Sequence, residues 1–136
     1  MARTLLLTGQ SLTREDFYAV VCENRRVALH PRARRAMRES RALVEKMIAE
    51  KQLVYGVTTG VGSLSTEHIE PAEARQLQLN LVRSHACGVG GPLDASETRG
   101  LLLLRANTLA RGLSGVRPVL VELLCDFLNR RVHPVV

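Results

Sequence analysis

Apolar residues recur at spacings of three and four over most of the chain, which is the spacing of one face of an α-helix. Four of these runs begin at a residue that suits a helix start: Thr13 and Asp94 as N-caps, and Pro31 and Pro71 in a first turn. Glycine-containing stretches end the later runs. The pattern therefore predicts five helices, at about 13–24, 31–52, 71–87, 94–111 and 120–131.

Two short apolar runs lack the helical spacing. Residues 4–7 precede a Thr-Gly pair, and residues 26–29 stop at His30 and Pro31. Short apolar runs bounded by turn residues are typical of strands. We expect the two runs to pair as a small ribbon, so the expected fold class is mainly α with a small two-stranded β ribbon.

The fourth predicted helix carries four consecutive leucines at 101–104. Consecutive residues point to different sides of a helix, so a run of this kind indicates a helix with several apolar sides. We therefore expect this helix to be buried on several sides.

Composition and charge fit a globular domain with its own core. The 136 residues are 46% hydrophobic and 24% charged. Nineteen Lys and Arg against thirteen Asp and Glu give a formal net charge of +6, which raises nucleic acid as a partner. The arginines are scattered, however, and only four residues are aromatic, so no basic run is interleaved with stacking side chains. A solvated surface explains the charge better, and we expect no nucleic-acid partner.

The three cysteines, Cys22, Cys87 and Cys125, lie far apart and show no Cys-x-x-Cys or Cys/His ligand spacing. This pattern argues against a disulfide framework or a zinc module, and we expect no metal site. No run of eighteen apolar residues occurs, and the N-terminal apolar run is too short for a signal peptide. The sequence predicts a cytoplasmic protein with no membrane partner.

A first candidate for chemistry is the long loop expected at 54–70, which is rich in Gly, Thr and Ser. Loops of this length in compact chains are usually functional or disordered. Tyr55 lies at its edge, and glycines such as Gly62 let a ligand approach closely. Tyr55 has two interpretations: a general base or acid, or a half-buried loop residue with a hydrogen-bonded tip. The residues alone favour the second.

A second candidate is His85, which continues the apolar stripe of the third predicted helix at its C-terminal end. In a functional interpretation its ring contacts a substrate. In a structural interpretation the ring forms hydrogen bonds with the last carbonyls of its own helix, where the helix dipole favours a histidine. The residues alone again favour the structural interpretation. Cys87 follows two positions later, and residues two apart on a helix point in different directions, so we expect no Cys/His nucleophile pair.

Three segments in order carry a family resemblance. They are Tyr-Gly-Val-Thr-Thr-Gly-Val-Gly at 55–62, Gln-Leu-Asn-Leu-Val-Arg-Ser-His-Ala-Cys-Gly-Val-Gly at 78–90, and Leu-Arg-Ala-Asn-Thr-Leu-Ala-Arg-Gly-Leu-Ser-Gly at 104–115. Over nearly its whole length the chain closely resembles the N-terminal third of the aromatic amino acid ammonia-lyases, which include the histidine, phenylalanine and tyrosine lyases and the aminomutases. Three motifs in the right order are far more specific than any one of them.

The resemblance implies a carbon–nitrogen lyase that eliminates ammonia from an aromatic L-amino acid. Tyr55 matches the catalytic loop tyrosine proposed as the base, and Gly62 closes the same loop against the ligand. His85 matches the position that contacts the substrate side chain. The Ser84-His85 pair resembles the histidine lyases, which convert L-histidine to urocanate. Family enzymes are homotetramers, so the implied partners are a small aromatic amino acid and further copies of the chain.

Family members carry 4-methylidene-imidazol-5-one (MIO), which forms from an internal Ala-Ser-Gly that this sequence lacks. We therefore expect residues 1–136 to be an incomplete N-terminal region, inactive by itself, in which no MIO can form. Thr58 stands where the histidine lyases usually have Asn, and Val61 where most members have Phe, which affects the expected substrate more than the reaction. The alternative is a stand-alone binding or regulatory protein that kept the fold without catalysis.

Overall fold

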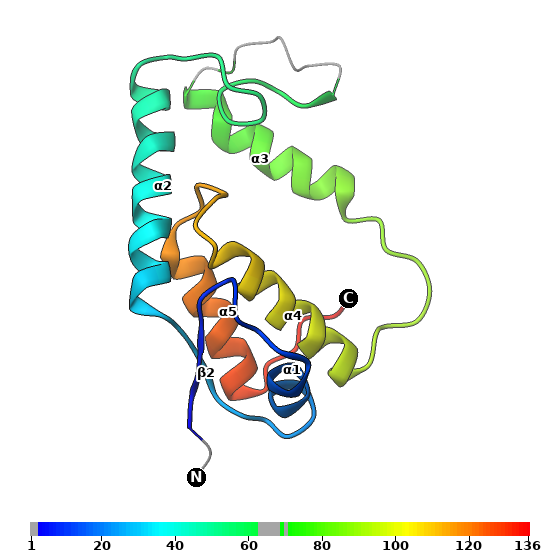
Figure 1. Ribbon diagram of the computed structural model, residues 1–136. Coiled ribbons are helices and arrows are strands. Elements are labelled where there is room, and N and C mark those ends of the chain that lie inside the picture. The colour runs from blue at the N-terminus through cyan, green and yellow to red at the C-terminus, as the bar shows by residue number, and fades with distance from the viewer. Residues whose placement is uncertain (1–2, 63–68, 70) are drawn as a thin grey trace. The chain divides into compact units, whose positions relative to one another are not determined.

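The computed structural model describes residues 3–62, 69 and 71–136 (Figure 1). Within that part of the chain the structure is mainly helical with one small two-stranded sheet, which confirms the expected fold class. Two compact units are formed, one by residues 1–42 and 91–136 and the other by residues 43–90. The elements are β1 (Leu5–Leu7), α1 (Arg14–Val21), β2 (Val27–Leu29), α2 (Pro31–Ala49), α3 (Pro71–His85), α4 (Ala95–Leu109) and α5 (Pro118–Arg130).

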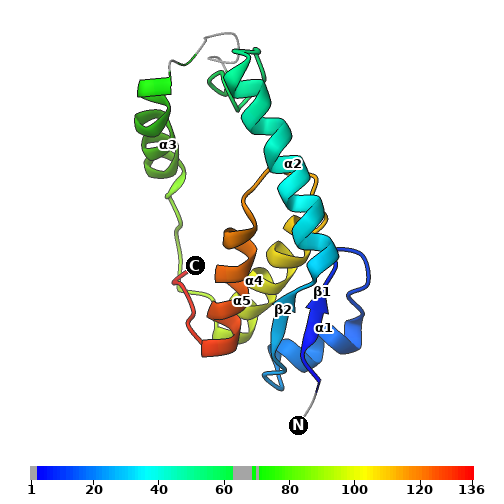
Figure 2. The same cartoon turned by 90° about the vertical axis from the view of Figure 1, so that its left-hand side faces the viewer.

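The sheet of the first unit pairs β1 with β2 in parallel, with Leu5 opposite Val27 and Leu7 opposite Leu29. Parallel neighbours need a crossover connection, and α1 supplies it (Figure 2). The Thr13 hydroxyl accepts the backbone N–H of Asp16 at 3.1 Å, so Thr13 is the N-cap of α1, as predicted.

The outer edge of β2 is covered by one side chain from α5. The Asn129 carboxamide accepts the Val27 N–H and donates to the Val27 carbonyl, both at 2.9 Å. A side-chain amide thus replaces the neighbouring strand at this position. This pairing satisfies backbone groups that an exposed strand edge would leave open.

Arg99 of α4 connects the C-terminal ends of two other helices. Its Nε donates to the Val21 carbonyl and its Nη1 to the Leu128 carbonyl, both at 3.0 Å, and its Nη2 donates to the Val20 carbonyl. Carbonyls at the end of a helix have no partner in their own helix and carry its negative pole. The buried guanidinium therefore caps α1 and α5 together.

Helix α4 begins with a complete capping box. The Asp94 carboxylate accepts the Glu97 N–H at 2.8 Å, and the Glu97 carboxylate accepts the Asp94 N–H at 3.0 Å. The Glu97 amide, followed by the Ser96 hydroxyl, lowers the pKa of Asp94. The N-cap expected at Asp94 is confirmed.

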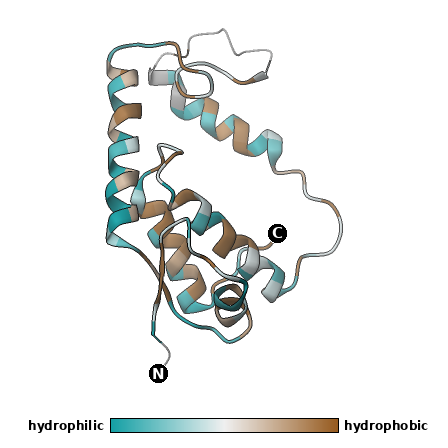
Figure 3. Ribbon diagram, viewed as in Figure 1, coloured by the Kyte–Doolittle hydropathy of each residue, from teal (hydrophilic) through white to brown (hydrophobic). Residues whose placement is uncertain are grey.

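The expectation that the leucine run is buried on several sides is wrong in part. Leu102 and Leu103 are in the core, but Leu101 and Leu104 are about half exposed, at 49% and 50%. Figure 3 shows α4 and α5 as largely hydrophobic, in contrast to the hydrophilic first turns of α2. The core of the first unit comprises Leu7, Val20, Val21, Val27, Leu29, Ala33, Met37, Leu102, Leu103, Ala106, Leu109, Ala110, Val121, Cys125 and Leu128.

Gly112 allows the turn after α4 to lie directly against α2. Its φ is +72°, and a Cβ at this position would lie 2.8 Å from both the carbonyl carbon and the Cβ of Ala36. The turn therefore requires glycine for its backbone conformation and for this contact. No helix in the described ranges is both long enough and apolar enough to span a bilayer.

The cysteines differ in exposure, which predicts their reactivity. Cys22 and Cys87 are exposed, whereas Cys125 is buried. Burial, assisted by the negative charges of Asp126 and Glu122, raises the pKa of the Cys125 thiol to about 12. Because the thiolate is the reactive form, we expect iodoacetamide at pH 8 to modify Cys22 and Cys87 in the folded chain and to leave Cys125 unmodified.

Peptide mass mapping of the alkylated protein measures this difference. The same reaction in urea is the control, and there all three cysteines should react. Modification of Cys125 at the rate of Cys22 in the folded protein would contradict the prediction.

Candidate functional site

The Tyr55 loop belongs to the second unit and is held in shape by Thr58. The Thr58 hydroxyl donates to the Gln52 carbonyl and accepts the Val54 N–H at 2.8 Å. The Thr58 carbonyl accepts the N–H of Ile69 at 3.0 Å, so the loop lies beside the segment that leads into α3. The side chain of Thr58 is buried, at 7% exposed. The position where the histidine lyases are expected to have Asn is thus a structural support of the loop.

Thr59 closes the tip of the same loop. Its hydroxyl accepts the Gly56 N–H at 3.3 Å and donates to the Gly60 carbonyl at 3.0 Å. Gly56 has a φ of +68°, which glycine adopts more readily than other residues. Two buried hydroxyls therefore fix the turn on the C-terminal side of Tyr55.

Tyr55 itself points to solvent from this turn, with 65% of its surface exposed. Its phenol oxygen accepts the backbone N–H of Gly62 at 3.4 Å. Gly62 has a φ of +61°, and apart from its chain neighbours no atom of the described residues lies within 4 Å of the position a Cβ would take. The described structure thus brings Tyr55 and Gly62 together, and it leaves the ring accessible instead of half-buried.

His85 is the exposed last residue of α3. Its Nδ1 lies 2.9 Å from the Leu81 carbonyl and 3.0 Å from the Ser84 hydroxyl. A carbonyl only accepts, so Nδ1 is the donor in the contact with Leu81, and in the tautomer with its hydrogen on Nδ1 the other nitrogen, Nε2, is an acceptor. The contact with Leu81 is the helix-end arrangement that the structural interpretation of His85 predicts, and it uses only one of the two ring nitrogens.

The structure does not bring His85 next to Tyr55. The Tyr55 loop bonds to Ile69, just before the start of α3, whereas His85 ends that helix. The fifteen residues of α3 place its two ends about 20 Å apart. Within the second unit the two candidate residues therefore mark opposite ends of one helix.

The chain's own residues do not fit the formation of MIO. Two triplets keep the serine of Ala-Ser-Gly and one of its neighbours: Leu113-Ser114-Gly115, which has leucine in place of alanine, and Ala95-Ser96-Glu97, which has glutamate in place of the glycine. The second triplet is the first turn of α4, where the Ser96 hydroxyl donates to the Asp94 carboxylate at 2.7 Å. It is therefore committed to helix capping, and no step through MIO is assigned to either triplet. Among the described residues no cluster of three or more His, Cys, Asp or Glu is arranged to hold a metal ion.

Sequence reasoning missed the two residues that build the Tyr55 loop. Thr58 was considered only as a departure from the family pattern, and Thr59 was not considered. Both are threonines between glycines, and a hydroxyl in such a segment often bonds to nearby backbone groups. That signal was available, but it does not reveal which backbone groups are bonded.

Comparisons with known proteins agree with this fold. The profile of the aromatic amino acid lyase family matches residues 12–136. Histidine ammonia-lyase from Koribacter versatilis is 52% identical over 98% of this chain, and the match covers 26% of that protein. The chain thus spans about a quarter of the length of this relative.

Two crystal structures show the same fold. Tyrosine aminomutase from Streptomyces globisporus superposes with a TM-score of 0.92 at 34% identity, over 98% of this chain and 26% of the other. Histidine ammonia-lyase from Trypanosoma cruzi superposes with a TM-score of 0.84, also at 34% identity, over 93% of this chain and 24% of the other. The chain belongs to the aromatic amino acid lyase family.

Proposed function

We propose that this chain supplies the tyrosine-bearing loop of a cytoplasmic, homotetrameric ammonia-lyase that converts L-histidine to urocanate and ammonia. The observation that carries the proposal is the fixed Tyr55 loop, in which the Gly62 N–H points at the phenol oxygen. The identity of 52% to a histidine ammonia-lyase supports the substrate. In a family enzyme the MIO electrophile that captures the substrate comes from residues other than these 136.

In this proposal Tyr55 removes a proton from the β-carbon of the amino acid. Such a proton is weakly acidic, so the base must carry negative charge, and an amide N–H directed at the oxygen stabilises that charge. Gly62 serves this role through its backbone and, because it has no side chain of its own, lets the substrate approach.

His85 orients the substrate side chain in the same proposal. Its Nε2 accepts a hydrogen bond, because Nδ1 already donates to Leu81. An imidazole N–H is the matching donor on L-histidine, whereas the tyrosine ring presents a hydroxyl further from its backbone. Family enzymes are homotetramers whose sites combine several copies, so Tyr55 and His85 would act in a pocket built partly by other chains.

A chimeric enzyme tests the proposal. Residues 12–136 replace the matching segment of the Koribacter versatilis histidine ammonia-lyase, and urocanate is followed by its ultraviolet absorbance. We expect turnover of L-histidine and little turnover of L-tyrosine. The isolated 136-residue chain is the matched control, and it should give no product because it lacks the Ala-Ser-Gly triplet.

Each result has a distinct meaning. A folded tetrameric chimera without turnover would contradict the lyase proposal and favour a non-catalytic binding role. A preference for L-tyrosine would overturn the substrate while leaving the reaction class intact. Turnover by the isolated chain would show that the expected inactivity is wrong.

A further inference from the structure

The residues on either side of Tyr55 are bonded to two different threonines. Val54, just before it, donates its N–H to the Thr58 hydroxyl at 2.8 Å. Gly56, just after it, donates its N–H to the Thr59 hydroxyl at 3.3 Å. Both threonines are buried, at 7% and 5% exposed, whereas Tyr55 is exposed at 65%. The backbone of an exposed tyrosine is thus held by buried hydroxyls of its own loop.

The two threonine hydroxyls differ in what else they bind. The Thr58 hydroxyl donates to the Gln52 carbonyl, so both of its bonds go to residues that precede the tyrosine. The Thr59 hydroxyl donates to the Gly60 carbonyl at 3.0 Å, two residues before Gly62. Thr59 therefore joins the segment that carries the phenol to the segment that carries the N–H beside it.

The contact between these two segments is easily lost. The Tyr55 phenol oxygen and the Gly62 nitrogen are 3.4 Å apart, at the long end of hydrogen-bond distances. Both residues are exposed, so a small displacement of either segment exchanges this bond for bonds to water. Gly62 has no side chain that could hold it in place by packing, and its position depends on the backbone that leads to it.

We infer that Thr59 is a positioning residue for the proton transfer, because its hydroxyl holds the Tyr55 phenol against the Gly62 N–H. This role rests on the proposed function, in which Tyr55 is the base. Thr59 touches no reacting atom and acts only through the tyrosine. Loss of its hydroxyl therefore slows the step that needs a correctly placed base and leaves substrate binding intact.

Substitutions at position 59 of the chimeric enzyme test the effect on the reaction. Thr59→Val removes the hydroxyl but keeps the shape of the side chain, and it should lower kcat for L-histidine at least about tenfold with little change in KM. Thr59→Ser keeps the hydroxyl and should hold kcat within about threefold of the parent. In a Tyr55→Phe background, Thr59→Val should lower kcat by less than about twofold, because the group that it positions is gone.

The Gly62 amide signal in the NMR spectrum of the 136-residue chain tests the contact without turnover. Tyr55→Phe removes the acceptor and should shift this signal. In a Thr59→Val chain the same substitution should no longer shift it, because the phenol and the N–H are already apart. Thr58→Val is the matched control: it removes a similarly buried hydroxyl whose bonds lie before the tyrosine, so Tyr55→Phe should still shift the signal in that chain.

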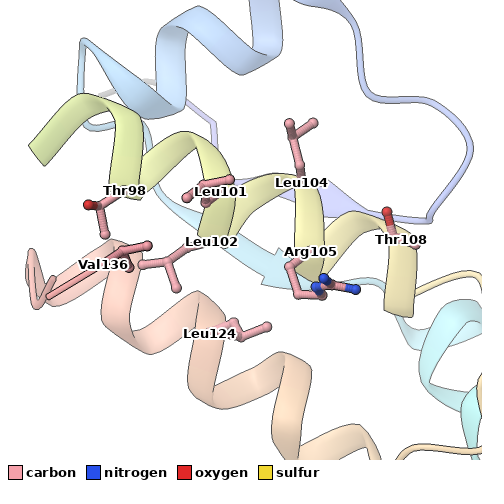
Figure 4. A pocket seen from close by; sticks show the side chains of 8 residues that line it. All are labelled: Thr98, Leu101, Leu102, Leu104, Arg105, Thr108, Leu124 and Val136. Atoms are coloured by element: carbon pink, nitrogen blue, oxygen red, sulfur yellow. The ribbon is translucent and has the colours of Figure 1, made fainter. Parts of the chain in front are cut away.

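A second control lies outside the loop. Thr108 is an exposed threonine on α4, at the hollow of the first unit that Figure 4 shows. Thr108→Val makes the same chemical change there, and the response of the Gly62 signal to Tyr55→Phe should remain. Loss of that response in the Thr108→Val chain would contradict a specific role for Thr59. Circular dichroism verifies that each variant is folded.

The remaining outcomes separate the role of Thr59 from that of Tyr55. A Tyr55→Phe chimera with undiminished kcat would contradict the proposed base, and the Gly62 signal would still decide whether Thr59 holds the contact. A kcat that falls with Tyr55→Phe but not with Thr59→Val would overturn the positioning role alone. So would a Thr59→Ser chimera as slow as Thr59→Val, or a Gly62 signal that responds to Tyr55→Phe in the Thr59→Val chain as strongly as in the unsubstituted chain.

Discussion

Replacing Arg99 by methionine is expected to lower the free energy of unfolding by about 3 kcal/mol. The side chain is 4% exposed and donates to three carbonyls at the ends of α1 and α5. Methionine fills similar apolar volume but donates no hydrogen bond. The carbonyls of the buried residues Val20 and Val21 then lose the guanidinium, while the Leu128 carbonyl keeps only the Arg131 N–H at 3.3 Å. The midpoint of urea unfolding, followed by far-ultraviolet circular dichroism, measures the loss.

One opposing effect must be weighed against this loss. Burial, and then the positive charge of Arg131, lower the pKa of the Arg99 guanidinium, so removing the charge relieves an unfavourable desolvation. The desolvation energy that is recovered is smaller than the hydrogen-bond energy that is lost. The carbonyl acceptors belong to the backbone, so they remain at these buried residues whatever side chain is at position 99.

Two further variants complete the test of Arg99. Arg99→Lys keeps the charge but replaces a planar fork of donors with one nitrogen, so it should be intermediate. Arg35→Met on α2 removes an exposed arginine and should change stability by less than about 0.5 kcal/mol. An Arg99→Met chain as stable as the Arg35→Met chain would show that the guanidinium is not needed to hold the helix ends.

The starts of the helices were predictable because their signals are local. Thr13 and Asp94 cap through side chains only three residues from the amides that they bind, and Pro31 and Pro71 begin helices where they were expected. The ends were placed about two or three residues too late in α1, α2 and α3. In α1 the cause is visible: Asn24 adopts a left-handed φ of +58° after the helix has ended, and asparagine gives a weaker stop signal than glycine.

The contacts that join the elements were not predictable from spacing. Arg99 and Val21 are 78 positions apart, and Asn129 and Val27 are 102 apart. Both side chains are polar, so the hydrophobic pattern gave no reason to place them inside the structure. Leu101 and Leu104 show the opposite error: the pattern placed them in the core, but they are about half exposed, at 49% and 50%.

The candidate site was predictable to different degrees. The glycines around Tyr55 predicted a turn that presents the tyrosine, and Gly62 does lie at its hydroxyl. The separation of Tyr55 from His85 by the length of α3 was not expected, since both residues came from one family resemblance. Motif order shows which residues belong to a family site, but it does not show where the fold places them along a helix.

Tyr55→Phe in the chimeric enzyme is expected to lower kcat for L-histidine at least about a hundredfold, with little change in KM. The substitution removes one oxygen and keeps the ring. The Gly62 N–H then loses the phenol oxygen as its acceptor, but Gly62 is exposed, so a water molecule takes the place of that oxygen. The hydrogen bonds of Thr58 that shape the loop are unchanged. Loss of the base therefore affects the proton transfer and not the binding of the amino acid. Initial rates of urocanate formation over a range of L-histidine concentrations measure both constants.

Tyr18→Phe is a closely matched control, because Tyr18 is the other tyrosine of the chain and is also exposed, at 59%, on α1 of the first unit. It should leave kcat within about twofold, since surface substitutions away from a site rarely matter. A Tyr55→Phe chimera with kcat within fivefold of the parent would exclude the phenol as the base. A rise in KM with kcat retained would instead assign Tyr55 to substrate binding, so the two constants together distinguish the role in proton transfer from a role in positioning.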